Sequence, residues 1–205
     1  DREEYGLSFN AYCSGLYLTI IRKREDGRLY VLEEEKKLEL IDDIIGWNQM
    51  CFVKHQNGMD WWIVLPKVLD DNAYIIRLNG ETGELGEIKE HYFSQHNGRV
   101  STGVNLVSSE DGTKLARLYN LQHPRNDSAM HKLELLHFDR CTGQAESYYF
   151  DSLAMSELNS AGADVEFSPN GRFLYVAISE FILQLDMELD NPLSQIDTVA
   201  RWDGF

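Results

Sequence analysis

The stretch VEFSPNGRFLYVAI (residues 165–178) predicts the unit from which the chain is built. Two runs rich in β-branched and aromatic residues flank Ser168-Pro169-Asn170-Gly171, and these four residues favour a tight turn. Proline fixes φ near its turn value, whereas asparagine and glycine tolerate a positive φ. The stretch is therefore expected to form a β-hairpin.

The same hairpin pattern recurs along the chain. It returns in CFVKHQNGMDWWIVL (51–65) and VNLVSSEDGTKLARLY (104–119), and the turn glycines of the three hairpins are separated by 54 and 59 residues. A second hairpin series alternates with the first and has its turn glycines at Gly27, Gly83 and Gly143, with steps of 56 and 60 residues. Each period therefore holds four antiparallel strands, which is typical of the blades of a β-propeller.

The sequence thus predicts an all-β fold, a partial β-propeller domain over residues 1–205 with about three and three-quarter blades. The expected blades cover approximately 1–45 (incomplete), 46–98, 99–158 and 159–205. The expected strands are Tyr5–Ala11, Gly15–Arg22, Leu29–Leu38, Met50–His55, Asp60–Leu65, Ala73–Asn79, Glu87–Phe93, Gly103–Ser108, Lys114–Leu121, Lys132–Asp139, Gln144–Phe150, Ala163–Ser168, Phe173–Ile178, Phe181–Met187 and Ile196–Trp202. Since the first blade lacks its innermost strand and no spare strand follows the last, we expect a piece of a larger, seven-bladed propeller.

Little helix is expected. The stretch DSLAMSELNSAG (151–162) has room for one short helical turn, capped by Asp151 or Ser152. The stretch LEEEKKLELIDD (32–43) has the charge pattern of a helix, but its place after the Gly27 turn favours an outer strand and its following loop.

The charge of the chain restricts its partners. Nineteen basic and 34 acidic residues give a net charge of −15, which repels nucleic acid and anionic membrane surfaces. No apolar run reaches the roughly 18 residues that would span a bilayer, so membrane insertion is not expected. The first residues, DREEYGLSFN, do not resemble a signal peptide.

Four stretches carry a resemblance to a known family: FVKHQNGMDWWIVLPK, HFDRCTG, VEFSPNGRFLYVA and ARWDGF, in this order. Together they resemble the WD40-like propeller region of large secreted Bacteroidetes proteins, which often carry gliding-associated or type IX secretion C-terminal sorting domains. The resemblance covers roughly Gly15 to Phe205. It implies a secreted or cell-surface location and provides no catalytic residues, although the connection at 120–131 is longer than expected and no sorting domain is present.

The most specific motif of this resemblance is His55-x-Asn57-Gly58-x-Asp60-Trp61-Trp62. Two adjacent indoles beside polar groups could stack on sugar rings. Alternation along a strand, however, sends the two rings to opposite faces, each toward a neighbouring blade. We therefore favour a structural motif, in which the His55 side chain bonds Asp60 across its own hairpin.

Neither a cofactor nor a catalytic group is indicated by motif. The six histidines lack zinc-site spacing, and the sequence has no nucleophile elbow, phosphate loop or dinucleotide fingerprint. A calcium site remains an alternative, because acidic loops occur at Asp70-Asp71-Asn72 and at 186–191, although neither has the EF-hand pattern. Cys13, Cys51 and Cys141 are expected to be small residues in or near the core, not disulfide partners.

Propeller topology places two polar loops, 94–102 and 120–131, on the same face of the molecule. Their donor groups are the candidates for contact with a small or anionic ligand or a partner: His96, Asn97, Arg99, His123, Arg125 and Asn126.

The function favoured by these patterns is a non-catalytic binding or scaffold module that contacts a protein or a glycan. One alternative is a propeller enzyme, a hydrolase or lyase, with its site at the mouth of the channel. The other is an intracellular WD-repeat-like adaptor. A scaffold should show an exposed aromatic or apolar contact patch, whereas an enzyme should gather ionisable groups with shifted pKa values at one mouth.

Overall fold

The computed structural model describes residues 16–38, 50–67, 72–93, 105–121, 130–153, 163–178 and 180–204. The strands of these residues form four sheets, each a simple antiparallel meander. The first sheet has β1 (Leu16–Lys23) and β2 (Leu29–Leu38), and the second has β3 (Cys51–Lys54), β4 (Trp61–Pro66), β5 (Asn72–Leu78) and β6 (Leu85–Tyr92). The third has β7 (Asn105–Ser108), β8 (Lys114–Leu121), β9 (Met130–Phe138) and β10 (Ala145–Ser152), and the fourth has β11 (Ala163–Phe167), β12 (Phe173–Ile178), β13 (Phe181–Asp186) and β14 (Ile196–Arg201).

Every one of these strands was predicted, with ends that differ by at most two residues. The reason is visible in the turns. In the β11–β12 hairpin the Gly171 amide donates to the Ser168 carbonyl at 2.8 Å, and Ser168 Oγ accepts from the Phe173 amide at 2.9 Å. Gly171 has a φ of +66°, a region that glycine enters without the steric penalty of a Cβ. The turn residues that mark a hairpin in the sequence thus also close it.

Because side chains alternate between the two faces of a strand, apolar residues gather on faces of each sheet, and these faces pack against the neighbouring sheets. One buried cluster joins the second and third sheets and another joins the third and fourth. In the fourth sheet, Val165 pairs with Val176 and Val176 with Leu183, and all three side chains are buried toward the third sheet. The core is therefore a series of layers between sheets, one behind the other.

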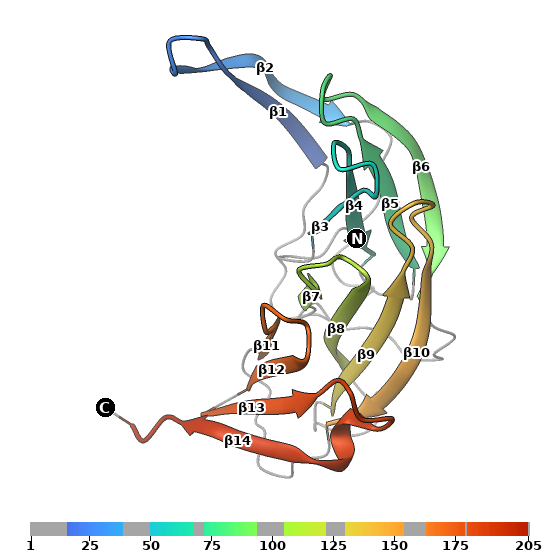
Figure 1. The fold of residues 1–205 in the computed structure, drawn as a ribbon, viewed down its shortest axis with the longest axis vertical. Coiled ribbons are helices and arrows are strands. Elements are labelled where there is room, and N and C mark those ends of the chain that lie inside the picture. The colour runs from blue at the N-terminus through green and yellow to red at the C-terminus, as the bar shows by residue number, and fades with distance from the viewer. Residues whose placement is uncertain are drawn as a thin grey trace, which may run out of the picture.

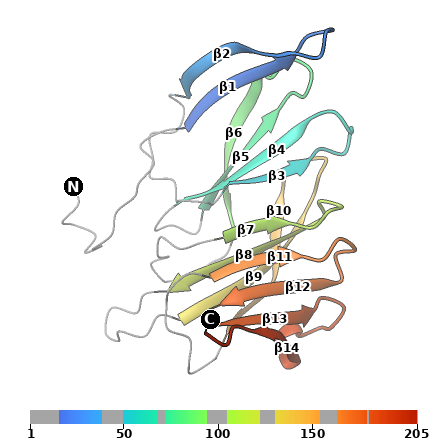
Figure 2. The same cartoon turned by 90° about the vertical axis from the view of Figure 1, so that its left-hand side faces the viewer.

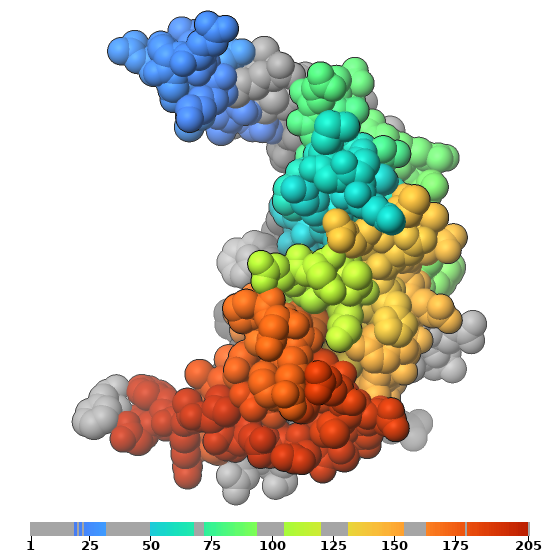
Figure 3. Space-filling view, in the orientation of Figure 1, coloured from blue at the N-terminus to red at the C-terminus, as the bar shows by residue number. Residues whose placement is uncertain are grey.

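The sheets follow one another along an arc, with their first strands innermost (Figure 1). Strand β7 adjoins both β3 and β11, and so links the second sheet to the fourth. Viewed from the side, the hairpin turns point the same way (Figure 2), and we call this side the hairpin side. The space-filling view shows that the arc encloses a concave side (Figure 3).

The structure corrects the caps expected for the helical turn in 151–162 but does not test the turn itself. Asp151 and Ser152 belong to β10, and residues 154–162 lie outside the described residues, as does the expected strand Tyr5–Ala11. Among the described residues, one 3-10 turn, η1 (Pro192–Ser194), was not predicted, and Asn191 caps it by accepting a bond from the Leu193 amide. In the stretch 32–43, the residues up to Leu38 are strand, as favoured by their place after the Gly27 turn.

The cysteine prediction is right for one residue and wrong for another. Cys51 is buried between the second and third sheets, whereas Cys141 is exposed in the β9–β10 turn. Cys13 lies outside the described residues. No helix in the described part of the chain has the length and hydropathy needed to cross a membrane.

Candidate functional site

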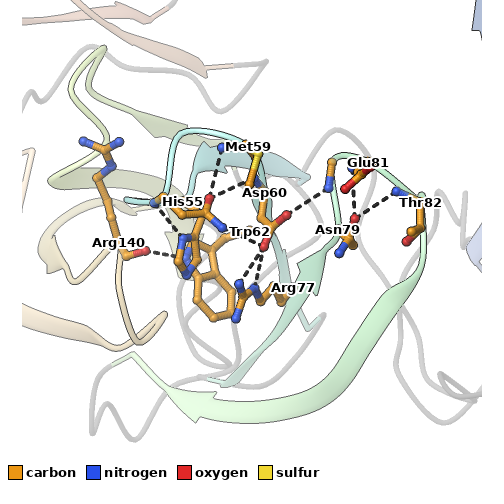
Figure 4. A network of polar contacts seen from close by, with 11 residues as sticks. His55, Met59, Asp60, Trp62, Arg77, Asn79, Glu81, Thr82 and Arg140 are labelled. Carbon is orange, nitrogen blue, oxygen red and sulfur yellow. Dashed lines mark hydrogen bonds and ion pairs between the residues drawn. The ribbon is translucent and has the colours of Figure 1, made fainter.

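The Asp60 carboxylate is the centre of a polar network on the hairpin side of the second sheet (Figure 4). Its Oδ2 accepts bonds from Arg77 Nε at 3.0 Å, Arg77 Nη2 at 2.6 Å and Asn57 Nδ2 at 2.9 Å. Its Oδ1 accepts a bond from the Gly80 amide at 3.0 Å. The bond from Gly80, followed by those from Arg77 and Asn57, lowers the pKa of Asp60 to about 2. Asp60 is therefore a satisfied structural anion rather than a base for proton transfer near neutral pH.

The hypothesis that the His55 side chain bonds Asp60 is wrong. His55 Nδ1 accepts a bond from the Asn57 amide at 3.0 Å, two residues along its own turn. The shorter Asn57 side chain, together with Arg77 from β5, takes the place at the carboxylate that the sequence assigned to His55. The His55 ring packs instead on Trp62, with 5.4 Å between ring centroids.

Trp62 fastens the second sheet to the third. Its Nε1 donates to the Arg140 carbonyl in the β9–β10 turn at 2.9 Å, and the Gln56 amide donates to the same oxygen at 3.1 Å. In return, Arg140 Nε donates to the Lys54 carbonyl at 2.8 Å. We call this set of bonds the Trp62 latch.

A glycine makes the close approach at the latch possible. A Cβ built on Gly143 would lie 2.8 Å from a ring carbon of Trp62, which is closer than real Cβ contacts allow. The φ of Gly143 is +75°, a left-handed conformation that favours glycine. Glycine is thus required at this position both for the turn and to leave room for the indole. With the Asp60 carboxylate satisfied and its turn packed against the next sheet, the His55–Trp62 motif is a structural joint.

Trp61 points to the opposite face, as alternation predicts, but the described residues of the neighbouring sheets leave it exposed. Trp61 is 38% exposed, and the Lys54 Nζ lies 5.9 Å from the centre of its ring. Phe52, two residues before Lys54 on the same face of β3, is 46% exposed, and Met59 in the adjoining turn is 64% exposed. We call these four residues the Trp61 patch. They form an aromatic and apolar surface with one cation, on the inner strands of the second sheet.

A second polar cluster, which the sequence did not predict, lies inside the third sheet. Arg117 on β8 and Glu134 on β9 are cross-strand neighbours whose side chains are 0% exposed, with 3.4 Å between Arg117 Nη1 and Glu134 Oε2. The residues two positions before and after Arg117, Leu115 and Tyr119, are also buried. The sequence did contain a signal for this burial. Residues two apart on a strand lie on the same face, and Leu115 and Tyr119 are typical core residues, so Arg117 between them was a candidate for the inner face.

The predicted loop cluster lies outside the described residues. This applies to His96, Asn97, Arg99, His123, Arg125 and Asn126, so their grouping on one face stays a prediction. Within the described ranges, no three His, Cys, Asp or Glu side chains gather as they would around a metal ion. Asp186, in one of the acidic stretches considered for calcium, instead accepts a bond from Arg172 Nη2 at 3.0 Å.

Comparisons with known proteins bear on the fold. No family model matches the sequence, and no curated protein matches it significantly. Among solved structures, Kuenenia stuttgartiensis hydrazine synthase is similar to this chain at 14% identity and a TM-score of 0.50. The match covers 82% of this chain and 52% of the hydrazine synthase chain. The Pseudomonas aeruginosa periplasmic gluconolactonase PpgL matches 93% of this chain and 66% of its own (17% identity, TM-score 0.48), and the Dos1 propeller 86% and 39% (12% identity, TM-score 0.48).

The present chain thus spans about half the length of the hydrazine synthase chain that it matches. At so low an identity the likeness concerns the fold and not the chemistry. The meander sheets, their face-to-face layers and the match at a TM-score of 0.50 together show an all-β chain with the architecture of a β-propeller.

Proposed function

We propose that this propeller domain is a non-catalytic binding module that contacts a protein or a glycan and belongs to a secreted or cell-surface protein. The Trp61 patch is the observation that carries the proposal. Exposed aromatic residues that lie next to one another favour contact with a partner, because an apolar surface gains free energy when it leaves water. Tryptophan is also enriched among the residues that dominate binding energy.

The support beneath the patch favours binding by a rigid surface. Trp61 and Trp62 are neighbours on β4, and Trp62 is 5% exposed and held by the latch to the third sheet. The turn that carries Met59 is closed by bonds from the Met59 and Asp60 amides to Asn57 Oδ1, both at 3.0 Å. A surface that is already ordered loses less conformational entropy when a partner binds.

The class of partner follows from shape and charge. Indole faces suit both the CH faces of sugars and the side chains of proteins. The net charge of −15 disfavours nucleic acid and anionic membrane surfaces. The secreted or cell-surface location rests on the resemblance to the WD40-like propeller region of secreted Bacteroidetes proteins.

Site-specific photo-crosslinking tests the binding proposal. A photoreactive phenylalanine analogue is placed at Trp61 and, as the matched control, at Ile182, which is 41% exposed on the fourth sheet. Each protein is incubated with the envelope fraction of the source cells, and a glycan array is read in parallel with the unmodified chain and the Trp61→Ala variant. We expect adducts specific to position 61, or glycan binding that Trp61→Ala abolishes.

Three outcomes would contradict the proposal. The first is the same set of adducts at positions 61 and 182 together with an array unaffected by Trp61→Ala. The second is saturable turnover of an ester, lactone or glycoside substrate by the purified chain, which would favour an enzyme. The third is recovery of the native protein in the cytoplasmic fraction by antibody, which would overturn the location alone.

A further inference from the structure

The guanidinium of Arg117 lies against two aromatic rings. Its central carbon lies 4.5 Å from the ring centre of Tyr119 and 5.6 Å from that of Phe93, which follows β6 of the second sheet. Aromatic faces attract a cation but do not accept its directed N–H bonds as a carbonyl or an anion would. Because the N–H bonds of a guanidinium lie in its plane, any hydrogen-bond acceptor of Arg117 must lie near that plane.

In that plane, one edge of the guanidinium is unused. Glu134 reaches only Nη1, at 3.4 Å, which is longer than the roughly 2.7–2.9 Å of a strong charge-assisted bond. Arg117 Nε and Nη2 are buried and have no hydrogen-bond partner among the residues that the structure describes. The same two nitrogens of Arg77 both bind Asp60 in this chain, at 3.0 and 2.6 Å. Arg117 thus presents the two-pronged edge that Arg77 fills with a carboxylate.

The charges around Arg117 favour an anion at this edge. Lys132 lies opposite Tyr119 on β9, and its Nζ is 5.3 Å from the ring centre of Phe150. Phe150 in turn stacks on Tyr119, so Lys132 belongs to the same face of the sheet. Among the described residues of this cluster, Arg117 and Glu134 are the two fully buried charges, and Lys132, which is half-buried and bonded to Ser152 Oγ, adds a second cation at the border. A second cation beside a buried ion pair makes the potential at the unused edge of Arg117 more positive, which favours an anion there.

We propose that the Nε–Nη2 edge of Arg117 binds one small monovalent anion, of the size and charge of chloride, between the second and third sheets. The size follows from burial, since the side chain is 0% exposed and a protein or glycan group does not reach it. A single charge matches the one cation, Lys132, that the cluster carries beyond the Arg117–Glu134 pair. A water molecule would satisfy the two donors but would bring no negative charge to them.

Thermal unfolding of the full chain tests the proposal, with chloride as the probe and gluconate, which is too large for the site, as the reference anion. Both are compared at equal ionic strength, so that screening is the same. We expect chloride at about ten times its Kd to raise Tm by about 3–6 °C. Bromide should act like chloride.

Two variants assign the effect to the site. Because Arg117→Met alone would leave the Glu134 carboxylate buried without its guanidinium, the test uses the double variant Arg117→Met/Glu134→Leu. Replacing a buried ion pair by apolar residues of similar volume often preserves the fold. We expect this variant to have the same Tm in chloride and gluconate. The matched control is Arg77→Gln, which should lower Tm but keep the full response to chloride, because its edge is filled by Asp60.

Anomalous diffraction from crystals of the unaltered chain in bromide gives a second measurement. We expect a peak within hydrogen-bond distance of Arg117 Nε and Nη2. Equal Tm values in chloride and gluconate, a chloride response that survives in the double variant, or a water molecule at the edge in bromide crystals would each overturn the proposal.

Discussion

Gly143 and Gly58 show how one residue type serves two purposes in this chain. Both have a φ of +75°, so both relieve the same backbone strain. They differ in their surroundings: a Cβ on Gly143 would meet Trp62 of the next sheet at 2.8 Å, whereas nothing lies within 4 Å of a Cβ on Gly58. Gly58 is therefore required by the backbone conformation of its turn alone, whereas Gly143 is required by its turn and also by the close contact between the sheets.

The pair gives a direct prediction. Gly58→Ala should lower the free energy of unfolding by roughly 1–2 kcal/mol, the cost of a left-handed alanine. Gly143→Ala should cost about 1–3 kcal/mol more, because its methyl group must also displace the Trp62 ring. Urea unfolding of both variants measures the difference. Equal losses would show that Trp62 does not press on this turn.

Asp60 predicts how stability depends on pH. Its pKa of about 2 in the folded chain lies below the ordinary value of 3.8, so the folded state binds this proton less readily than the unfolded state. The stabilisation is thus fully present above pH 3.8 and is lost as the pH falls toward 2. Asp60→Asn should flatten the fall in the free energy of unfolding over this window.

Denaturant unfolding at a series of pH values between about 2 and 5 measures this slope. Asp197→Asn, on the exposed face of β14, is the control and should leave the slope of the parent chain unchanged. If the Asp60→Asn curve ran parallel to that of the parent chain, the network around Asp60 would not supply the expected stabilisation.

At the scale of the element, the hairpin was predictable because its determinants are close together in sequence. Asn170 and Gly171 define the β11–β12 turn, and the alternation beside them defines the strands. The latch was not predictable in this way, since 78 residues separate Trp62 from Arg140. The error about His55 has the same origin, because Arg77, which takes its place at Asp60, comes from another hairpin of the same sheet.

Trp62 and Trp61 allow the latch to be tested on adjacent residues of β4. Trp62→Phe should cost roughly 2–3 kcal/mol, from the lost bond to the Arg140 carbonyl and the smaller buried ring. Trp61→Phe should change the free energy of unfolding by less than about 0.5 kcal/mol, because its ring is part of the exposed patch. Urea unfolding distinguishes the two. Similar losses at both positions would mean that the latch does not hold the sheets together.

At the scale of the whole molecule, the sequence predicts the number and order of the strands better than what happens between the sheets. Arg117 appears in the sequence as one charge within an apolar strand, and its burial depends on the second sheet, which covers it with Phe93. Likewise, Trp61 remains exposed because none of the described residues of a neighbouring sheet covers it, and alternation alone cannot reveal this. Function is hard to read for the same reason: the patch and the Arg117 cluster are products of how sheets are stacked.

Cys51 offers a probe of that stacking, because it lies 6% exposed in the layer between the second and third sheets. Burial, the largest influence, raises the pKa of its thiol to about 11, so at neutral pH the reactive thiolate is scarce as well as inaccessible. Cys141 is exposed in the β9–β10 turn and serves as the internal control. In a Cys13→Ser variant, a disulfide reagent should label Cys141 at once and Cys51 only when the layer opens.

If the free energy of opening this layer is about 4 kcal/mol, Cys51 should react about 1,000 times more slowly than Cys141. Mass spectrometry of the labelled peptides follows both thiols in one sample. Adding Trp62→Phe should speed the labelling of Cys51 and leave that of Cys141 unchanged, because the latch and the thiol share the same layer. Equal rates for the two cysteines in the parent variant would mean that the second and third sheets are not held together as one packed unit.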